Sequence, residues 1–207
     1  MTTEIGARLR AAAREDGLVA ALRLLNEETG GGALAHGPAG HAVAPVAPAA
    51  PAGGTATVVR TIELHGDTLV ALRDPQGRRA RPAWSLGLLW LRLGLSEALL
   101  DHCLAYLGER TSGDTPLLLQ QMVKGQLAEA VTDHLEIETL LAGTEPDDLG
   151  DDTAAWLHER VTRADRTLLR LLGGSGFRAD GPGATADVSE LLADAYAGRD
   201  RTEEVNR

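Results

Sequence analysis

The sequence predicts a mostly α-helical protein whose main part is an antiparallel four-helix bundle. Hydrophobic residues make up 43% of its 207 residues, whereas aromatic residues make up only 3%, so its core must be built from Leu, Ala and Val, and two of these, Leu and Ala, are strong helix formers. From about residue 85 onward, apolar residues recur at helical spacing in long segments with short connections. Long helices with short connections are typical of antiparallel neighbours in a bundle.

Residues 1–30 predict two short helices and residues 31–55 predict a linker. Apolar residues at helical spacing run through the first segment, and Gly17 marks the break between the helices. The second segment is rich in Gly, Ala and Pro and almost free of charge, so we expect it to be extended and mobile.

For residues 56–83 the sequence predicts a small β-hairpin, because β-branched residues alternate with other residues on either side of two turns. The first turn is expected at His65-Gly66-Asp67 and the second at Pro75-Gln76-Gly77, with a short third strand through Arg81. An isolated hairpin is only marginally stable, so it must pack on the bundle.

Residues 84–198 predict the bundle, and residues 199–207 a polar tail. The first helix begins near Ser85 and is apolar nearly all round, which is typical of a buried helix. The other helices are expected at Thr115–Gly143, with Pro116 in its first turn, at Thr153–Leu172 and at Thr185–Tyr196.

Charge and composition exclude several classes of function. The net charge is −10 and Lys124 is the single lysine, so the chain does not have the basic surface of a nucleic-acid-binding protein. The apolar run Leu86–Leu95 is interrupted by Arg92 and is too short to cross a membrane. One cysteine, Cys103, allows no internal disulfide, which favours a cytoplasmic location.

Three groups of residues resemble functional sites, and each has a simpler interpretation. His134 and Glu138, beside Asp133 and Glu136, lack the Glu-x-x-His pairs of a di-metal bundle, so we expect a solvated acidic face and no metal site. His102 and Cys103 are adjacent on a helix and point about 100° apart, which favours a buried, inert thiol.

The segment LLGGSGF holds the third group, Gly173, Gly174, Ser175 and Gly176. The pattern of a nucleophilic serine needs a glycine where Phe177 stands. A phosphate-binding loop precedes a helix, whereas these glycines follow one, so at least one of them is expected to cap its C-terminus.

Three segments in order resemble the C-terminal helical domain of the acyl-CoA dehydrogenase family: LSEALLDHCLAYLGER, PLLLQQMVKGQLAE and RADRTLLRLLGGSGF. Members of that family are FAD-dependent oxidoreductases that oxidise the α,β bond of acyl thioesters. The resemblance covers roughly residues 84–198. It implies that the short segments before the bundle stand in place of the family's N-terminal helical domain and central β-domain.

The resemblance also implies a set of cofactor-binding residues, which would contact the ADP part of an FAD held by a neighbouring subunit. In the family an arginine at the end of one helix is followed by a hydroxyl or amide residue, and a glutamine comes eleven residues after the arginine; Gly-Gly-x-Gly follows a later helix. The matching positions here are Arg110, Ser112, Gln121, Gly173, Gly174 and Gly176. Gly113 and Asp114 replace the family's Phe-Gly, and Arg170 stands where many members have glutamine.

The two positions that carry the family's catalytic glutamate read Ala197 and Trp84 here, and neither residue can accept a proton. We therefore expect a partner subunit, which completes the FAD site of a fuller homologue, or of a second copy, acting on acyl-CoA or acyl-carrier-protein thioesters. The first alternative is a flavin-independent binding or isomerising protein that uses His102, Glu97 or Trp84. The second is a purely structural role.

Overall fold

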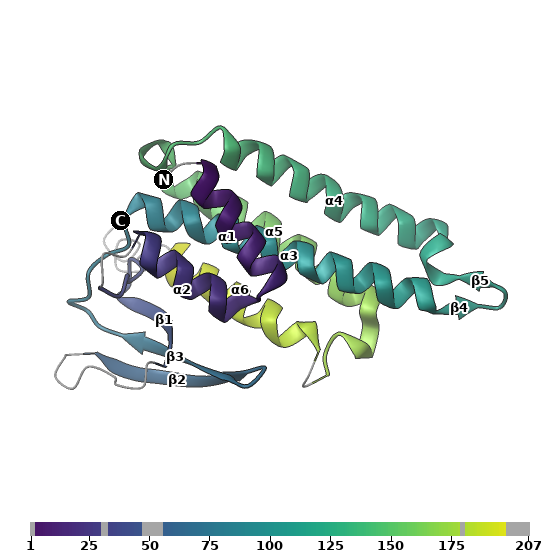
Figure 1. Cartoon of the computed structure of the whole chain (residues 1–207), viewed down its shortest axis with the longest axis horizontal. Helices are drawn as coiled ribbons and strands as arrows, with labels where there is room; N and C mark the ends of the chain where they lie inside the picture. The colour runs from purple at the N-terminus through teal and green to yellow at the C-terminus, as the bar shows by residue number, and fades with distance from the viewer. Residues whose placement is uncertain (1–2, 30–32, 47–55, 179–180, 198–207) are drawn as a thin grey trace, which may run out of the picture.

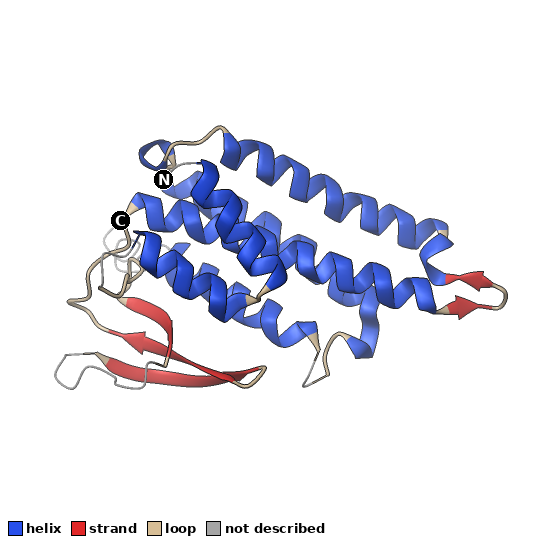
Figure 2. Ribbon diagram, viewed as in Figure 1, coloured by secondary structure: helices blue, strands red, loops and turns tan. Residues whose placement is uncertain are grey.

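The computed structural model describes residues 3–29, 33–46, 56–178 and 181–197, and these residues form a helical bundle with a small sheet at one side (Figures 1 and 2). The helices are α1 (Thr3–Glu15), α2 (Leu18–Thr29), α3 (Pro82–Glu109), α4 (Gln121–Ala142), α5 (Asp151–Leu172) and α6 (Pro182–Ala197). The strands are β1 (His41–Pro45), β2 (Thr57–Leu64), β3 (Asp67–Arg73), β4 (Thr111–Ser112) and β5 (Thr115–Pro116). Short 3₁₀ turns, η1 (Leu117–Leu119), η2 (Pro146–Asp148) and η3 (Gly173–Ser175), lie between the later helices.

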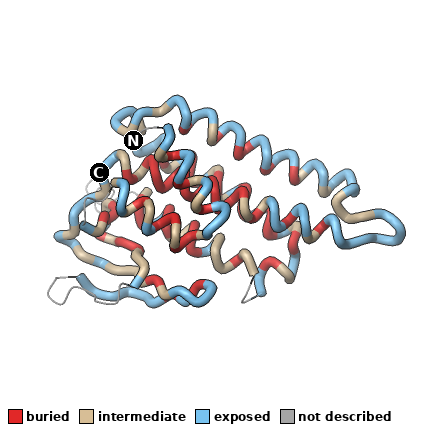
Figure 3. The backbone as a smooth tube through the Cα atoms, in the orientation of Figure 1, coloured by how far each residue is buried: buried red, intermediate tan, exposed pale blue. Residues whose placement is uncertain are grey.

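The helix α3 is the centre of the fold. It contacts α1, α2, α4, α5 and α6, and every residue from Leu86 to Glu97 is buried (Figure 3). By length and composition α3 is also apolar enough to cross a membrane, but 78% of its most apolar 18-residue window is buried inside the protein. A helix that is apolar all round needs neighbours on every side, and here other helices supply them.

The predicted four-helix bundle is confirmed. The helices α3, α4, α5 and α6 are neighbours that run up and down along the long axis of the molecule (Figure 1). Gly143 ends α4, and its N–H donates to the carbonyls of Leu140 and Leu141. The helices α5 and α6 begin at Asp151 and Pro182, slightly before the predicted starts at Thr153 and Thr185.

The predicted start of α4 at Thr115 is wrong. Thr115 and Pro116 form β5, which pairs with β4 around a turn where Gly113 adopts a φ of +61°. The carbonyl of Arg110 accepts a hydrogen bond from the N–H of Leu117, at 2.7 Å, and the extended Gln120 separates η1 from α4. Pro116 therefore ends a strand, and the helix begins five residues later.

The predicted break at Gly17 is confirmed, since α1 and α2 meet there with a φ of +87° at Gly17. The crossing of α1 over α3 depends on glycine. A Cβ on Gly94 would collide with the carbonyl oxygen of Arg10 and lie 2.9 Å from the Cβ of Ala13. A Cβ on Gly6 would likewise collide with the indole ring of Trp90. The two backbones therefore approach more closely than larger residues permit.

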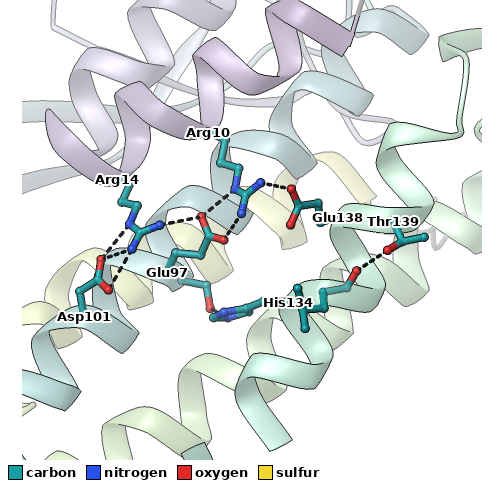
Figure 4. Close-up of polar contacts among 9 residues, drawn as sticks. Arg10, Arg14, Glu97, Asp101, His134, Glu138 and Thr139 are labelled. Atoms are coloured by element: carbon teal, nitrogen blue, oxygen red, sulfur yellow. Dashed lines mark hydrogen bonds and ion pairs between the residues drawn. The ribbon is translucent and has the colours of Figure 1, made fainter. Parts of the chain in front are cut away.

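Ion pairs hold α1 against α3 and α4 (Figure 4). Arg10 Nε donates to Glu97 Oε2 at 2.8 Å, and the same guanidinium pairs with Glu138. One turn on, Arg14 Nε donates to Asp101 Oδ2 at 2.8 Å. Glu97 is nearly buried, and a bidentate arginine is the partner that a buried carboxylate needs.

The predicted hairpin is confirmed, with β2 and β3 joined at His65-Gly66, but its third strand is not the predicted segment through Arg81. The third strand is β1, in the sheet order β1-β3-β2, and it lies inside the segment 31–55 that the sequence predicted to be a linker. Ala42 and Val43 of β1 are buried against the helices. Residues 47–55 of the predicted linker and the predicted tail at 199–207 lie outside the described residues.

The glycine at the α1–α3 crossing can be tested with a second helical glycine as its control. We expect Gly94→Ala to lower the free energy of unfolding by about 1–3 kcal/mol, because the added methyl group overpacks the crossing. A Cβ on Gly125 of α4 would meet no atom within 4 Å, so Gly125→Ala should raise stability by about 0.5–1 kcal/mol. Urea unfolding followed by circular dichroism measures both changes. Equal changes in the free energy of unfolding for the two variants would contradict the inference that the close approach of α1 and α3 requires glycine at position 94.

Candidate functional site

Three of the six residues implied by the resemblance lie between α3 and α4, and all three are exposed. Arg110 follows the last residue of α3, and its guanidinium stacks over the ring of Tyr106 at 4.3 Å from the centroid. Ser112 lies in β4, and Gln121 is the first residue of α4. The cation–π contact holds the arginine fork at the surface, where it can pair with an anion.

The three glycines behave differently from one another. Gly173 caps α5 as predicted, with a φ of +55° and its N–H donating to the carbonyls of Leu169 and Arg170. Gly174 is exposed, and a Cβ there would meet no atom within 4 Å. Gly176 is buried, and a Cβ there would lie 3.2 Å from the Cβ of Leu172. Only Gly173 and Gly174 therefore offer bare backbone to a ligand.

These residues share one end of the bundle. A cluster of buried apolar residues, among them Leu107, Leu127 and Leu172, joins the end of α3, the start of α4 and the end of α5. In Figure 1 the end of α3 and the start of α4 meet at the projecting β4–β5 hairpin, and α5 ends on the same side of the molecule, short of the hairpin. The structure thus brings Arg110, Ser112 and Gln121 to the same end of the bundle as the glycine segment. We call this exposed end the Arg110 surface.

The two positions of the family's catalytic base also come together, at the other end of α3. The rings of Trp84 and Tyr196 stack with centroids 4.0 Å apart, and Ala197 follows Tyr196. The indole of Trp84 donates to Asn26 Oδ1 at 3.2 Å. The Tyr196 hydroxyl accepts from the N–H of Val43 and donates to the carbonyl of Ala35, both at 3.1 Å. Side chains of the core therefore occupy this place, and burial raises the pKa of Tyr196.

A buried polar cluster, which the sequence did not single out as a site, surrounds Arg92 in the middle of α3. The Arg92 guanidinium donates to Ser189 Oγ and to Thr162 Oγ1, each at 2.9 Å, and to the His158 carbonyl at 3.1 Å. It also lies 2.9 Å from His158 Nδ1, which must accept because arginine only donates. Burial lowers the pKa of Arg92 to about 10 and lowers the pKa of His158 strongly. The sequence does carry a signal for this cluster: Arg92 is a single arginine inside an apolar helix, and a buried charge requires polar partners.

The acidic group on α4 is not the solvated face that the sequence predicted. Asp133 and His134 are buried, and Asp133 pairs with Arg160 and Arg163 at 2.7 and 2.8 Å. His134 Nε2 lies 2.8 Å from Ser96 Oγ, and burial lowers the pKa of the imidazole.

Its two glutamates are paired as well: Glu136 with Arg160, and Glu138 with Arg10 (Figure 4). Within the described ranges no group of three or more His, Cys, Asp or Glu side chains is arranged to hold a metal ion.

The other residues considered as functional candidates differ in how far they are buried. Cys103 is buried, and burial raises the pKa of its thiol to about 11, whereas His102 is exposed, as predicted for adjacent residues of a helix. Glu97 is engaged by Arg10 and Arg14, and Trp84 is part of the core. Of the three residues considered for a flavin-independent function, only His102 is free to meet a ligand at the surface.

The structure is similar to solved acyl-CoA dehydrogenases. The steroid ACAD Tcur3481–Tcur3483 aligns with 81% of this chain and 54% of its own, with a TM-score of 0.53 at 19% identity. The butyryl-CoA dehydrogenase of Megasphaera elsdenii aligns with 77% of this chain and 49% of its own, with a TM-score of 0.51 at 15% identity. A glutaryl-CoA dehydrogenase of Mycobacterium smegmatis in complex with FADH2 aligns with 77% of this chain and 50% of its own, with a TM-score of 0.53 at 18% identity.

Comparison of the sequence with protein-family models and with curated proteins gives no match. This chain spans about half the length of the solved structures that it matches. The aligned share, 77–81% of the chain, is larger than residues 84–198 can supply, so the similarity includes part of the segments before the bundle. The chain therefore has the fold of the C-terminal helical domain of acyl-CoA dehydrogenases, together with part of what precedes that domain.

Proposed function

We propose that this chain is a partner subunit that completes the FAD site of a fuller acyl-CoA-dehydrogenase-like flavoprotein. That flavoprotein acts on the CH–CH bond of acyl thioesters, carried on CoA or on a carrier protein. The observation that carries the proposal is the Arg110 surface, where Arg110, Ser112, Gln121 and Gly174 are all exposed. The residues are retained at one end of the bundle and left uncovered by the described parts of this chain.

The Arg110 surface fits the ADP end of a flavin in part. Arg110 presents a planar fork that matches pyrophosphate oxygens, and its stacking on Tyr106 restricts its motion. Gly173 and Gly174 allow close approach of a ligand to the backbone, whereas Gly176 is used for packing within the chain. Arg170, in the last turn of α5, is exposed and adds positive charge near these glycines.

The described residues do not fit a complete flavin site. Their one sheet of any size, β1-β3-β2, packs on α2 and α6, away from the β4–β5 hairpin (Figure 1). FAD supplies the acceptor for the two electrons of the CH–CH oxidation, and in this proposal the partner holds its ring. Because Trp84 and Ala197 cannot take a proton, the partner also supplies the base.

Exposed apolar side chains near the Arg110 surface support a protein partner. Leu119 of η1 is 54% exposed, Met122 in the first turn of α4 is 80% exposed, and Phe177 after the glycines is 67% exposed. Farther along α4, Leu135 is 57% exposed. Apolar groups gathered in this way are typical of an interaction surface. One of the similar structures also carries a name that joins two components, Tcur3481 and Tcur3483.

A second candidate function is the binding of a small molecule without flavin. The observation in its favour is that His102 lies at the rim of a cavity of about 420 Å³.

Co-expression with a fuller homologue encoded beside this chain tests the first proposal. We expect a yellow 1:1 complex that loses flavin with Arg110→Ala, because the pyrophosphate of FAD then has no guanidinium group to pair with. Arg8→Ala removes another exposed arginine, in α1, and should leave the flavin bound. Gly174→Ala should leave the isolated chain at least as stable as before and weaken flavin retention in the complex, because only a ligand approaches that position. Flavin absorbance per complex after gel filtration is the measurement.

Two outcomes contradict the proposal. One is a colourless chain that forms no complex with the homologue. The other is a yellow complex whose flavin content is unchanged by Arg110→Ala and Gly174→Ala together.

A further inference from the structure

A cavity of about 420 Å³ opens where α1, α3, α5 and α6 meet, beside the turn between β2 and β3. Its size falls within the range of sites for small organic molecules. Apolar side chains form much of its wall, among them Leu95, Ala98 and Ala186. Polar side chains from four different elements lie at its floor and rim.

Asp165 of α5 lines this cavity and is only 5% exposed. Its Oδ1 atom is buried and has no hydrogen-bond partner among the described residues. Leaving a buried acceptor unsatisfied costs stability, so such a group calls for an explanation. Because the Asp165 carboxyl group lines the cavity, a ligand with a hydrogen-bond donor would find an acceptor there.

The charges around the cavity favour a cationic donor. Glu15 and Asp16, at the end of α1, lie at its rim. Arg14 lies there too, but its guanidinium pairs with Asp101 and approaches Glu97. Arg92, which faces Asp165 from α3, is engaged by hydroxyl and imidazole groups and offsets the carboxylate charge in part.

Two histidines complete the rim. His102 comes from α3, and His65 comes from the β2–β3 turn, where its Nε2 lies 3.1 Å from Thr185 Oγ1.

We propose that this cavity binds a small, largely apolar molecule through an ammonium or hydroxyl donor to the carboxyl group of Asp165. The ammonium is the tighter ligand because of Glu15 and Asp16. The site is distinct from the other two regions of interest. Trp84 precedes Leu95 by about 16 Å of helix, and Arg110 follows His102 by about 12 Å. The inference deepens the second candidate function, the binding of a small molecule without flavin. It does not depend on flavin binding at the Arg110 surface, and either can fail alone.

A matched series of probes tests the site: cyclohexylmethylamine, cyclohexylmethanol and cyclohexanecarboxylate, each titrated into the full chain with methyl resonances followed by NMR. We expect the amine and the alcohol to shift the methyl signals of Ala98, Leu95 and Ala186 in a saturable way. The carboxylate should not, because it brings no donor to Asp165 and is repelled at the rim.

Asp165→Asn should weaken amine binding at least tenfold, and Asp187→Asn, which removes an exposed charge of α6 beside Ala186, should change it less than twofold. Ala98→Leu, which fills the cavity without touching the polar floor, should abolish the saturable shifts from both donors. Absence of saturable shifts with every probe, binding of the carboxylate as tightly as the amine, or undiminished amine binding by Asp165→Asn or Ala98→Leu would overturn the proposal.

The stability of the protein gives a check on Asp165 that needs no ligand. Burial raises the pKa of this carboxyl to about 6, against the effects of Ser96 and Arg92, with Glu190 adding to the rise. Between pH 4 and 6 the folded protein therefore holds a proton that the unfolded chain has lost, so the stability due to this group falls as the pH rises.

We expect Asp165→Asn to raise the melting temperature relative to the unaltered protein more at pH 8 than at pH 4. His134 and His158 titrate in both proteins, so their effect cancels in this difference. A difference that does not change with pH would contradict an ionised, unsatisfied Asp165.

Discussion

The complete burial of α3 is the constraint on which the rest of the structure depends. Because the helix is apolar on every side, five other helices must cover it, and their places are set by the two charged residues that it carries inward. Arg92 requires acceptors from α5 and α6, and Glu97 requires arginines from α1. Each charge would be costly alone, and each selects one arrangement of neighbours. The ends of α3 are then left to different tasks: Trp84 closes the core at one end, and Arg110 reaches solvent at the other.

Much of the fold could be predicted from local signals, because helices and their ends are determined largely by residues that are close in the sequence. Gly17 and Gly173 end helices as their conformational freedom predicts, and leucine spacing places the four helices of the bundle. The strand β1 could not be predicted, because its Ala42 and Val43 stand in a Gly- and Pro-rich segment. The strand becomes recognisable only through Tyr196, which lies 153 residues beyond Val43. The start of α4 was misplaced because Pro116 is compatible with a helical first turn and with the end of a strand.

The candidate site likewise combines features that local sequence predicts with features that depend on contacts between distant residues. The order of motifs predicted a set of cofactor-binding residues, of which Arg110, Ser112 and Gln121 lie between α3 and α4. It did not predict that Gly176 would be packed against Leu172. Asp133 and His134 were misread as solvated because Arg163 and Ser96, their partners, come from other helices. Asp165 has no signature at all in the sequence. Its importance rests on an empty hydrogen-bonding position, which only the surrounding side chains define.

The hydrogen bonds of Tyr196 bear on how the protein is made. They join α6 to residues 153 and 161 positions earlier, in β1 and the segment before it. A ribosome must therefore complete nearly all of α6 before β1 and the stack on Trp84 can settle. Until then the apolar surface of α3 has no lasting cover on that side, and contacts of such long range form late. Until α6 emerges, the nascent chain therefore carries an apolar side of α3 that is open to aggregation.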